Sequence, residues 1–163
     1  LALLAALAAL WFSGRLRREA GLPQGRVVSS DTSRWSKVEK PLYDPGSGLT
    51  GRPDYLVEEK GLLIPIEVKS SRAPSVPFDS HIFQLAAYCF LVEHVYGRRP
   101  PYGILRYRDR AFTIDNTPEL QRELARLLEA IRGQRRAGEA GRSHQEPARC
   151  ARCGYRSLCD ERL

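Results

Sequence analysis

The spacing of apolar positions changes along the chain, and this change predicts a mixture of strands and helices. Short apolar runs between turn residues predict strands, which we expect within residues 25–32, 34–43, 49–70, 102–107 and 111–114. Apolar residues three or four apart predict helices over residues 78–96 and from Thr117-Pro118 onward, where threonine suits the cap and proline the first turn. The sequence therefore predicts an α/β fold.

A predicted hairpin over residues 49–70 carries two acids and a lysine. Asp54 ends the Gly51-Arg52-Pro53-Asp54 run, and a polar turn at 58–61 leads into a strand with Glu67 and Lys69. Alternate strand residues share a face, so Glu67 and Lys69 point the same way, and the hairpin can bring Asp54 beside Glu67. Such a group can hold a divalent metal and position a water, because Mg²⁺ prefers oxygen ligands. The alternative is a solvated surface hairpin.

A second motif lies on the predicted helix, where Gln84 and Tyr88 share a face at positions i and i+4. Pro53-Asp54 followed by Glu67-Val68-Lys69 resembles the PD-(D/E)xK nuclease signature, and Gln84 to Tyr88 resembles the Gln-x-x-x-Tyr motif of its RecB-like branch. The resemblance implies a restriction-endonuclease-like core, a mixed central sheet flanked by helices.

The resemblance also implies an activity, metal-dependent hydrolysis of DNA phosphodiester bonds on single strands or DNA ends. Asp54, Glu67 and the Val68 carbonyl would hold Mg²⁺ or Mn²⁺, Lys69 would orient the water or stabilise the transition state, and Gln84 and Tyr88 would support the site. Members of this branch usually carry an upstream metal-site histidine. No histidine precedes Asp54 here, so either one of the upstream acids Asp31, Glu39 and Asp44 takes its place or the metal site has fewer protein ligands than is usual in the family.

Three cysteines crowd into the last fourteen residues, as Cys150, Cys153 and Cys159. This spacing resembles the tail of the CRISPR-associated RecB-like exonucleases, which implies a four-iron four-sulfur cluster. Their fourth cysteine lies upstream of the core, where this chain has none, and His144 can complete either a cluster or a structural zinc site. Iron–sulfur is favoured slightly over zinc. Cys89 is expected to be a small core residue.

The chain has a net charge of +7, which favours a phosphate-bearing partner such as DNA, although a basic stripe can equally attract anionic lipid. Arg52, Arg72 and Arg106 are candidate phosphate contacts. Leu1–Phe12 is an apolar run followed by arginines, the pattern of a membrane helix leaving on the cytoplasmic side. Twelve helical residues span only about 18 Å, and the sequence begins at Leu1 with no Met, so we expect part of a longer anchor. A signal-peptide core and a buried helix are the alternatives.

Taken together, the sequence predicts five segments: an apolar anchor (1–12), a basic linker (13–24), a nuclease core (25–132), a second linker (133–143) and a Cys-rich metal or cluster tail (144–163). We expect a membrane-tethered metal-dependent deoxyribonuclease on the cytoplasmic face, with CRISPR adaptation or repair proteins as possible partners. The competing hypothesis is a catalytically weak, membrane-tethered module of the same fold that binds DNA or docks a partner.

Overall fold

A mixed six-stranded sheet forms the centre of the protein in the computed structural model, which describes residues 26–28, 35–138, 141, 142 and 144–163. The chain divides into two units, Leu1–Ala125 and Arg126–Leu163, each described below by itself. The strand order is β1-β8-β7-β6-β5-β2. The strands are β1 (Arg26–Val28), β2 (Trp35–Lys37), β5 (Tyr55–Glu59), β6 (Leu62–Val68), β7 (Tyr102–Arg106) and β8 (Ala111–Asp115). Only β6 and β7 pair in parallel; the other neighbours are antiparallel.

The hairpin of β5 and β6 is confirmed, with Tyr55 opposite Ile66 and Glu59 opposite Leu62. Lys60 and Gly61 both have positive φ, 51° and 75°, as a two-residue turn between twisted strands requires. The expected start of this hairpin at residue 49 is wrong. Strand β4 (Leu49–Gly51) pairs instead with β3 (Leu42–Asp44), in a separate two-stranded sheet.

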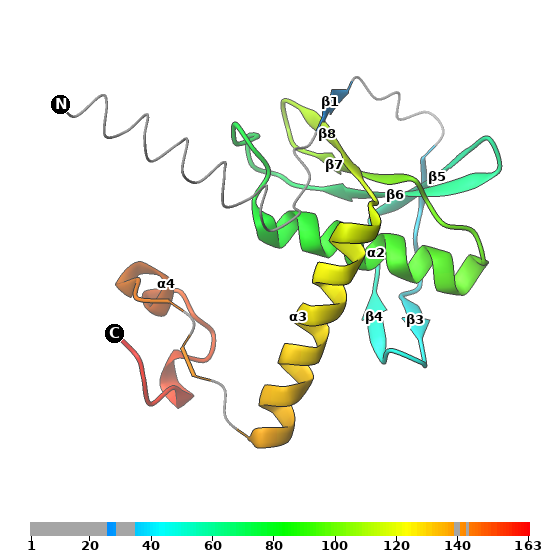
Figure 1. Cartoon of the computed structure of the whole chain (residues 1–163). Coiled ribbons are helices and arrows are strands. Elements are labelled where there is room, and N and C mark those ends of the chain that lie inside the picture. The colour runs from blue at the N-terminus through cyan, green and yellow to red at the C-terminus, as the bar shows by residue number, and fades with distance from the viewer. Residues whose placement is uncertain (1–25, 29–34, 139–140, 143) are drawn as a thin grey trace. The chain divides into compact units, whose positions relative to one another are not determined.

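Helix α2 (Asp79–Tyr96) crosses one face of the central sheet (Figure 1) and matches the helix predicted over 78–96. Its expected apolar stripe is buried at Ile82, Leu85, Ala86, Cys89 and Val92. Tyr96 was expected on the same stripe, but its side chain is 45% exposed, so the stripe ends at Val92. A side chain at Gly103 of β7 would meet Leu85 at 2.6 Å, so glycine allows the helix its close approach to the sheet.

Helix α3 (Pro118–Ala137) begins where proline and threonine predicted it, and the Leu120 N–H donates to the Thr117 hydroxyl at 3.2 Å. Its first turns are buried through Leu120 and Leu124. The helix continues past residue 132, so the segment expected to be a linker from residue 133 is helical as far as Ala137.

The C-terminal unit holds two short helices beyond α3, α4 (Pro147–Ala151) and the 3₁₀ helix η1 (Arg156–Leu158). The predicted anchor at 1–12 and the linker at 13–24 lie outside the described residues and stay predictions. Among the helices that the structure does describe, none combines the length and apolar character needed to span a bilayer.

Candidate active site

Asp54 and Glu67 lie at the end of the hairpin, each directly next to one residue of its last pair, Tyr55 and Ile66. Asp54 is fixed by the backbone of the opposite strand, since the Val68 N–H donates to its Oδ2 at 2.8 Å. Its neighbour Pro53 is fully buried. The Pro-Asp pair thus places one carboxylate beside the strand that carries the other, as the sequence predicted.

Lys69 connects the hairpin to helix α2. Its ammonium donates to Glu67 Oε1 at 2.8 Å and to Gln84 Oε1 at 2.8 Å. The Gln84 amide in turn donates from Nε2 to Glu67 Oε1 at 2.9 Å. The three side chains therefore form a closed ring of hydrogen bonds between β6 and α2.

Tyr88 extends this ring along the helix, because Gln84 Nε2 also donates to its hydroxyl at 2.9 Å. The amide of Gln84 thus uses its acceptor and both of its donors within the site. A side chain added at Gly51 would meet the Tyr88 ring at 2.9 Å. Gly51 of β4 therefore leaves the space that the Tyr88 ring fills, a role that the sequence pattern gave no means of assigning.

Glu67 is only 7% exposed, and this burial raises the pKa of its carboxyl. Lys69 acts in the opposite direction on that pKa, and the charge of Asp54 raises it further. Burial also raises the pKa of Tyr88, with smaller upward contributions from the charges of Glu67 and Asp54. The site thus holds two carboxylates that repel each other and a phenol that keeps its proton.

This donor set fits a divalent metal ion. Asp54 and Glu67 provide carboxylate oxygens, and their mutual repulsion is what a bound cation relieves. The Val68 carbonyl is the expected third ligand, and the N–H of the same residue donates a hydrogen bond to Asp54. Asp44 is engaged elsewhere, because its Oδ2 accepts a hydrogen bond from the Ser47 N–H at 2.7 Å in the turn between β3 and β4.

His81, to which the sequence pattern assigned no role, lies one turn before Gln84 on α2 and hydrogen-bonds to a buried tyrosine. Its Nδ1 is 2.7 Å from the hydroxyl of Tyr107, which is completely buried after β7. Burial lowers the pKa of His81, and the charge of Lys69 lowers it further. The signal available in the sequence was the spacing of His81, Gln84 and Tyr88, which places all three along one helix face.

A family model for the PD-(D/E)XK nuclease superfamily matches residues 2–160, nearly the whole chain. The chain belongs to this superfamily. The mixed α/β architecture is consistent with the restriction-endonuclease-like fold, and membership implies a nuclease that acts on DNA and typically uses Mg²⁺ or Mn²⁺. No curated protein matches the sequence.

The cysteine tail forms a chain of consecutive turns. The Cys153 N–H donates to the Cys150 carbonyl at 3.1 Å, and the Cys159 N–H donates to the Arg156 carbonyl at 3.5 Å. Cys150 is buried and Cys153 is exposed, and both are free thiols. Nowhere in the described part of the nuclease do three or more His, Cys, Asp or Glu side chains group closely enough to hold a metal. The cluster or zinc assignment, with His144 as a ligand, stays a prediction.

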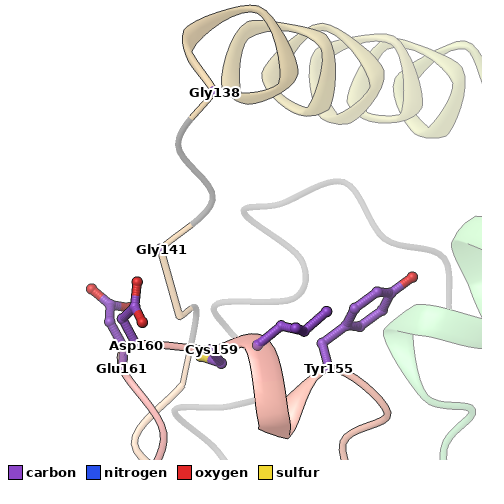
Figure 2. Close-up of a pocket in the computed structure, with 7 residues that line it drawn as sticks. Gly138, Gly141, Tyr155, Cys159, Asp160 and Glu161 are labelled. Atoms are coloured by element: carbon purple, nitrogen blue, oxygen red, sulfur yellow. The ribbon is translucent and has the colours of Figure 1, made fainter.

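A cavity of about 790 Å³ lies in the C-terminal unit, and Figure 2 shows the residues that line it. They are Gly138, Gly141, Tyr155, Leu158, Cys159, Asp160 and Glu161. Arg142 fixes the end of the chain beside it, donating from Nε to the Glu161 carbonyl at 2.7 Å. All of these lining residues belong to the C-terminal unit.

Proposed function

We propose that this protein is a metal-dependent DNA nuclease of the RecB-like exonuclease type, acting on single strands or DNA ends. The observation that supports this best is the ring of hydrogen bonds joining Lys69, Glu67 and Gln84. The PD-(D/E)xK residues and the Gln-x-x-x-Tyr residues lie far apart in sequence, yet they share one network. A solvated surface hairpin gives no reason for such a network.

Each residue of the candidate site has a separate role in the proposed hydrolysis. Asp54, Glu67 and the Val68 carbonyl would hold the metal, which when bound lowers the pKa of a water and neutralises charge on the phosphate. Lys69 uses two of its three N–H groups on Glu67 and Gln84, as far as the described residues show. The third can donate to the attacking water or to a phosphate oxygen.

Gln84 and Tyr88 keep Lys69 and Glu67 in place. Gln84 joins α2 to Glu67 of β6 and to Lys69, which follows that strand, and Tyr88 in turn accepts a hydrogen bond from Gln84, so the ammonium is held at the proposed metal-binding carboxylate before substrate arrives. Preorganised charge of this kind stabilises a transition state without reorganisation during the reaction. Arg52 and Arg72 are exposed, and with Arg106 they are our candidate contacts for neighbouring phosphates.

The remaining features are proposed on sequence resemblance. Cys150, Cys153 and Cys159, with His144, would hold an iron–sulfur cluster in preference to zinc, which would fasten the tail to the domain. The run at 1–12 would tether the nuclease to the cytoplasmic face of a membrane. CRISPR adaptation or repair proteins are the proposed partners.

The decisive experiment follows end-labelled single-stranded DNA with the full chain in Mn²⁺. We expect progressive shortening of the DNA by the wild type and loss of cleavage in Glu67→Gln and Lys69→Ala, with folding checked by circular dichroism. Glu58→Gln, an exposed acid on the same hairpin, is the matched control and should cleave normally. If the wild type and both site variants bind DNA tightly but none cleaves it, the protein is the binding module and the nuclease proposal fails.

A further inference from the structure

Tyr107 lies beside Lys69 on the face of the sheet that α2 covers. In the parallel register of β6 and β7, Glu67 is opposite Leu105, and the Lys69 N–H donates to the Arg106 carbonyl at 2.8 Å. Lys69 and Tyr107 each follow the last residue of their strand, two positions beyond Glu67 and Leu105, so the alternation returns their side chains to the same face and they are lateral neighbours. The site therefore continues past Lys69, toward the N-terminal turn of α2.

His81 is the helix residue that meets Tyr107 there. Its ring contacts Phe78 in an edge-to-face arrangement at 5.4 Å and is tilted against Tyr107 at 5.8 Å. It lies three residues before Gln84, on the helix face that carries the ring of hydrogen bonds. The imidazole is only partly buried, so part of it stays accessible to a ligand.

The hydrogen bond to Tyr107 fixes the tautomer of His81. Tyr107 is completely buried, and its hydroxyl bonds within the described residues only to His81 Nδ1, at 2.7 Å. A buried O–H needs an acceptor, so the tyrosine donates and Nδ1 accepts. The proton of the neutral imidazole is then on Nε2, and this N–H is left as a donor.

The charge of Lys69 favours this neutral form. Burial and the nearby ammonium both lower the pKa of His81, which disfavours a second cation beside Lys69. A neutral N–H still donates well to an anionic oxygen, and a hydrogen bond to a charged group is stronger than one between neutral groups.

We propose that His81 is a substrate-contacting residue, donating from Nε2 to a non-bridging phosphate oxygen of the DNA strand that lies beside Lys69. Tyr107 is the positioning residue that directs this donor. The inference rests on the proposed nuclease function for the identity of the ligand, and it adds a phosphate contact that neither the acid–lysine motif nor the Gln-x-x-x-Tyr motif contains.

Two substitutions of His81 distinguish the effect of the Nε2 hydrogen-bond donor from the effect of ring packing. His81→Asn keeps an acceptor near the Nδ1 position for Tyr107 but removes the distal donor, whereas His81→Gln places an amide donor near the Nε2 position. His94→Asn is the matched control, because His94 is on the same helix and bonds only the Phe90 carbonyl, at 2.9 Å, among the described residues. The measurement is the Kd of the full chain for a single-stranded oligonucleotide in EDTA, with KM and kcat in Mn²⁺.

We expect His81→Asn to raise Kd and KM about ten-fold or more, with a smaller effect on kcat. His81→Gln should stay within about three-fold of the wild type, and His94→Asn should be unchanged. Equal losses in the Asn and Gln variants would show that ring packing matters rather than the donor, and the proposal would fail. A His81→Asn protein that binds like His94→Asn overturns it as well.

A spectroscopic measurement tests the proposal without any variant. In ¹⁵N–¹H spectra of the histidine rings, His81 should show a protonated Nε2 and an unprotonated Nδ1, and its Nε2 signal should move when oligonucleotide is added in EDTA. His94 should not respond. If the protein cleaves DNA but the Nε2 signal of His81 does not move, the His81 contact is wrong and the nuclease proposal is unaffected. If the signal moves but the protein never cleaves DNA, the nuclease proposal is wrong and the contact is still supported.

Discussion

Replacing Gly51 with alanine should disturb the active site from the opposite side of Tyr88. The added methyl would lie 2.9 Å from Cε1 and 3.3 Å from Cδ1 of the Tyr88 ring, and 3.2 Å from Cδ1 of Leu91. The ring cannot yield freely, because its hydroxyl accepts a hydrogen bond from Gln84 at 2.9 Å. Any shift of the ring therefore reaches the amide that holds Lys69.

The size of the effect follows from two opposing contributions. Overpacking by one methyl costs roughly 1–3 kcal/mol, while the loss of unfolded-state freedom on going from glycine to alanine returns roughly 0.4–1 kcal/mol. We expect Gly51→Ala to lower the free energy of unfolding by about 1–2 kcal/mol. In a chain of this length that corresponds to a fall in Tm of roughly 2–8 °C.

Gly46→Ala is the matched control, because its methyl would touch only Asp44, at an ordinary 3.6 Å. It should be as stable as the wild type or slightly more stable. Urea and thermal unfolding followed by circular dichroism measure both variants, and cleavage of labelled DNA measures the disturbance of the site. A Gly51→Ala protein that unfolds and cleaves like Gly46→Ala would refute the argument that this glycine makes room for Tyr88.

The remaining predictions concern charge and metal. Since the folded-state pKa of Glu67 is raised above its ordinary 4.5, ionised Glu67 costs stability as pH rises through that folded-state pKa. Glu67→Gln should therefore have a higher free energy of unfolding in urea than the wild type at pH 7 in metal-free buffer. The difference in free energy should shrink toward pH 5, and a difference that stays constant with pH would contradict this. Lys69→Met removes the cation that lowers the pKa of Glu67, so carboxyl ¹³C titration should show that pKa rising further, with cleavage reduced about 100-fold or more; an unshifted titration would show that Lys69 does not act on Glu67. On the proposed iron–sulfur assignment, the wild type should contain iron and absorb visible light, and Cys153→Ser should lose both, as metal analysis and absorption spectra would measure. A colourless wild type that contains zinc would contradict the cluster and support a zinc site.

Much of the fold followed from local pattern. The turn at Lys60-Gly61, the long apolar stripe of α2 and the Thr117-Pro118 start of α3 are strong local signals, and each element formed where it was expected. The site was predictable for the same reason, because strand alternation fixes Glu67 relative to Lys69 and helix spacing fixes Gln84 relative to Tyr88.

The sequence could not predict which strands pair, nor the contacts between residues that lie far apart along the chain. Leu49–Gly51 is apolar enough to join the main hairpin, and nothing local shows that it pairs with Leu42–Asp44 instead. His81 and Tyr107 are twenty-six residues apart and meet only because β6 and β7 are parallel neighbours. The helix α3 also continues through Gly133, since one glycine in a helix costs only about 1 kcal/mol.

The three hydrogen bonds of the Gln84 amide have a consequence for the newly synthesised chain. The hairpin that carries both proposed metal-binding acids leaves the ribosome before α2 does, yet the Lys69 ammonium is held in part by an amide of that later helix. Until α2 packs against β6, Lys69 lacks its hydrogen bond to Gln84 and Glu67 is not yet buried. On the proposed roles of these residues, the site is organised only after the core has assembled, so a partly made chain would not be able to cut nearby nucleic acid.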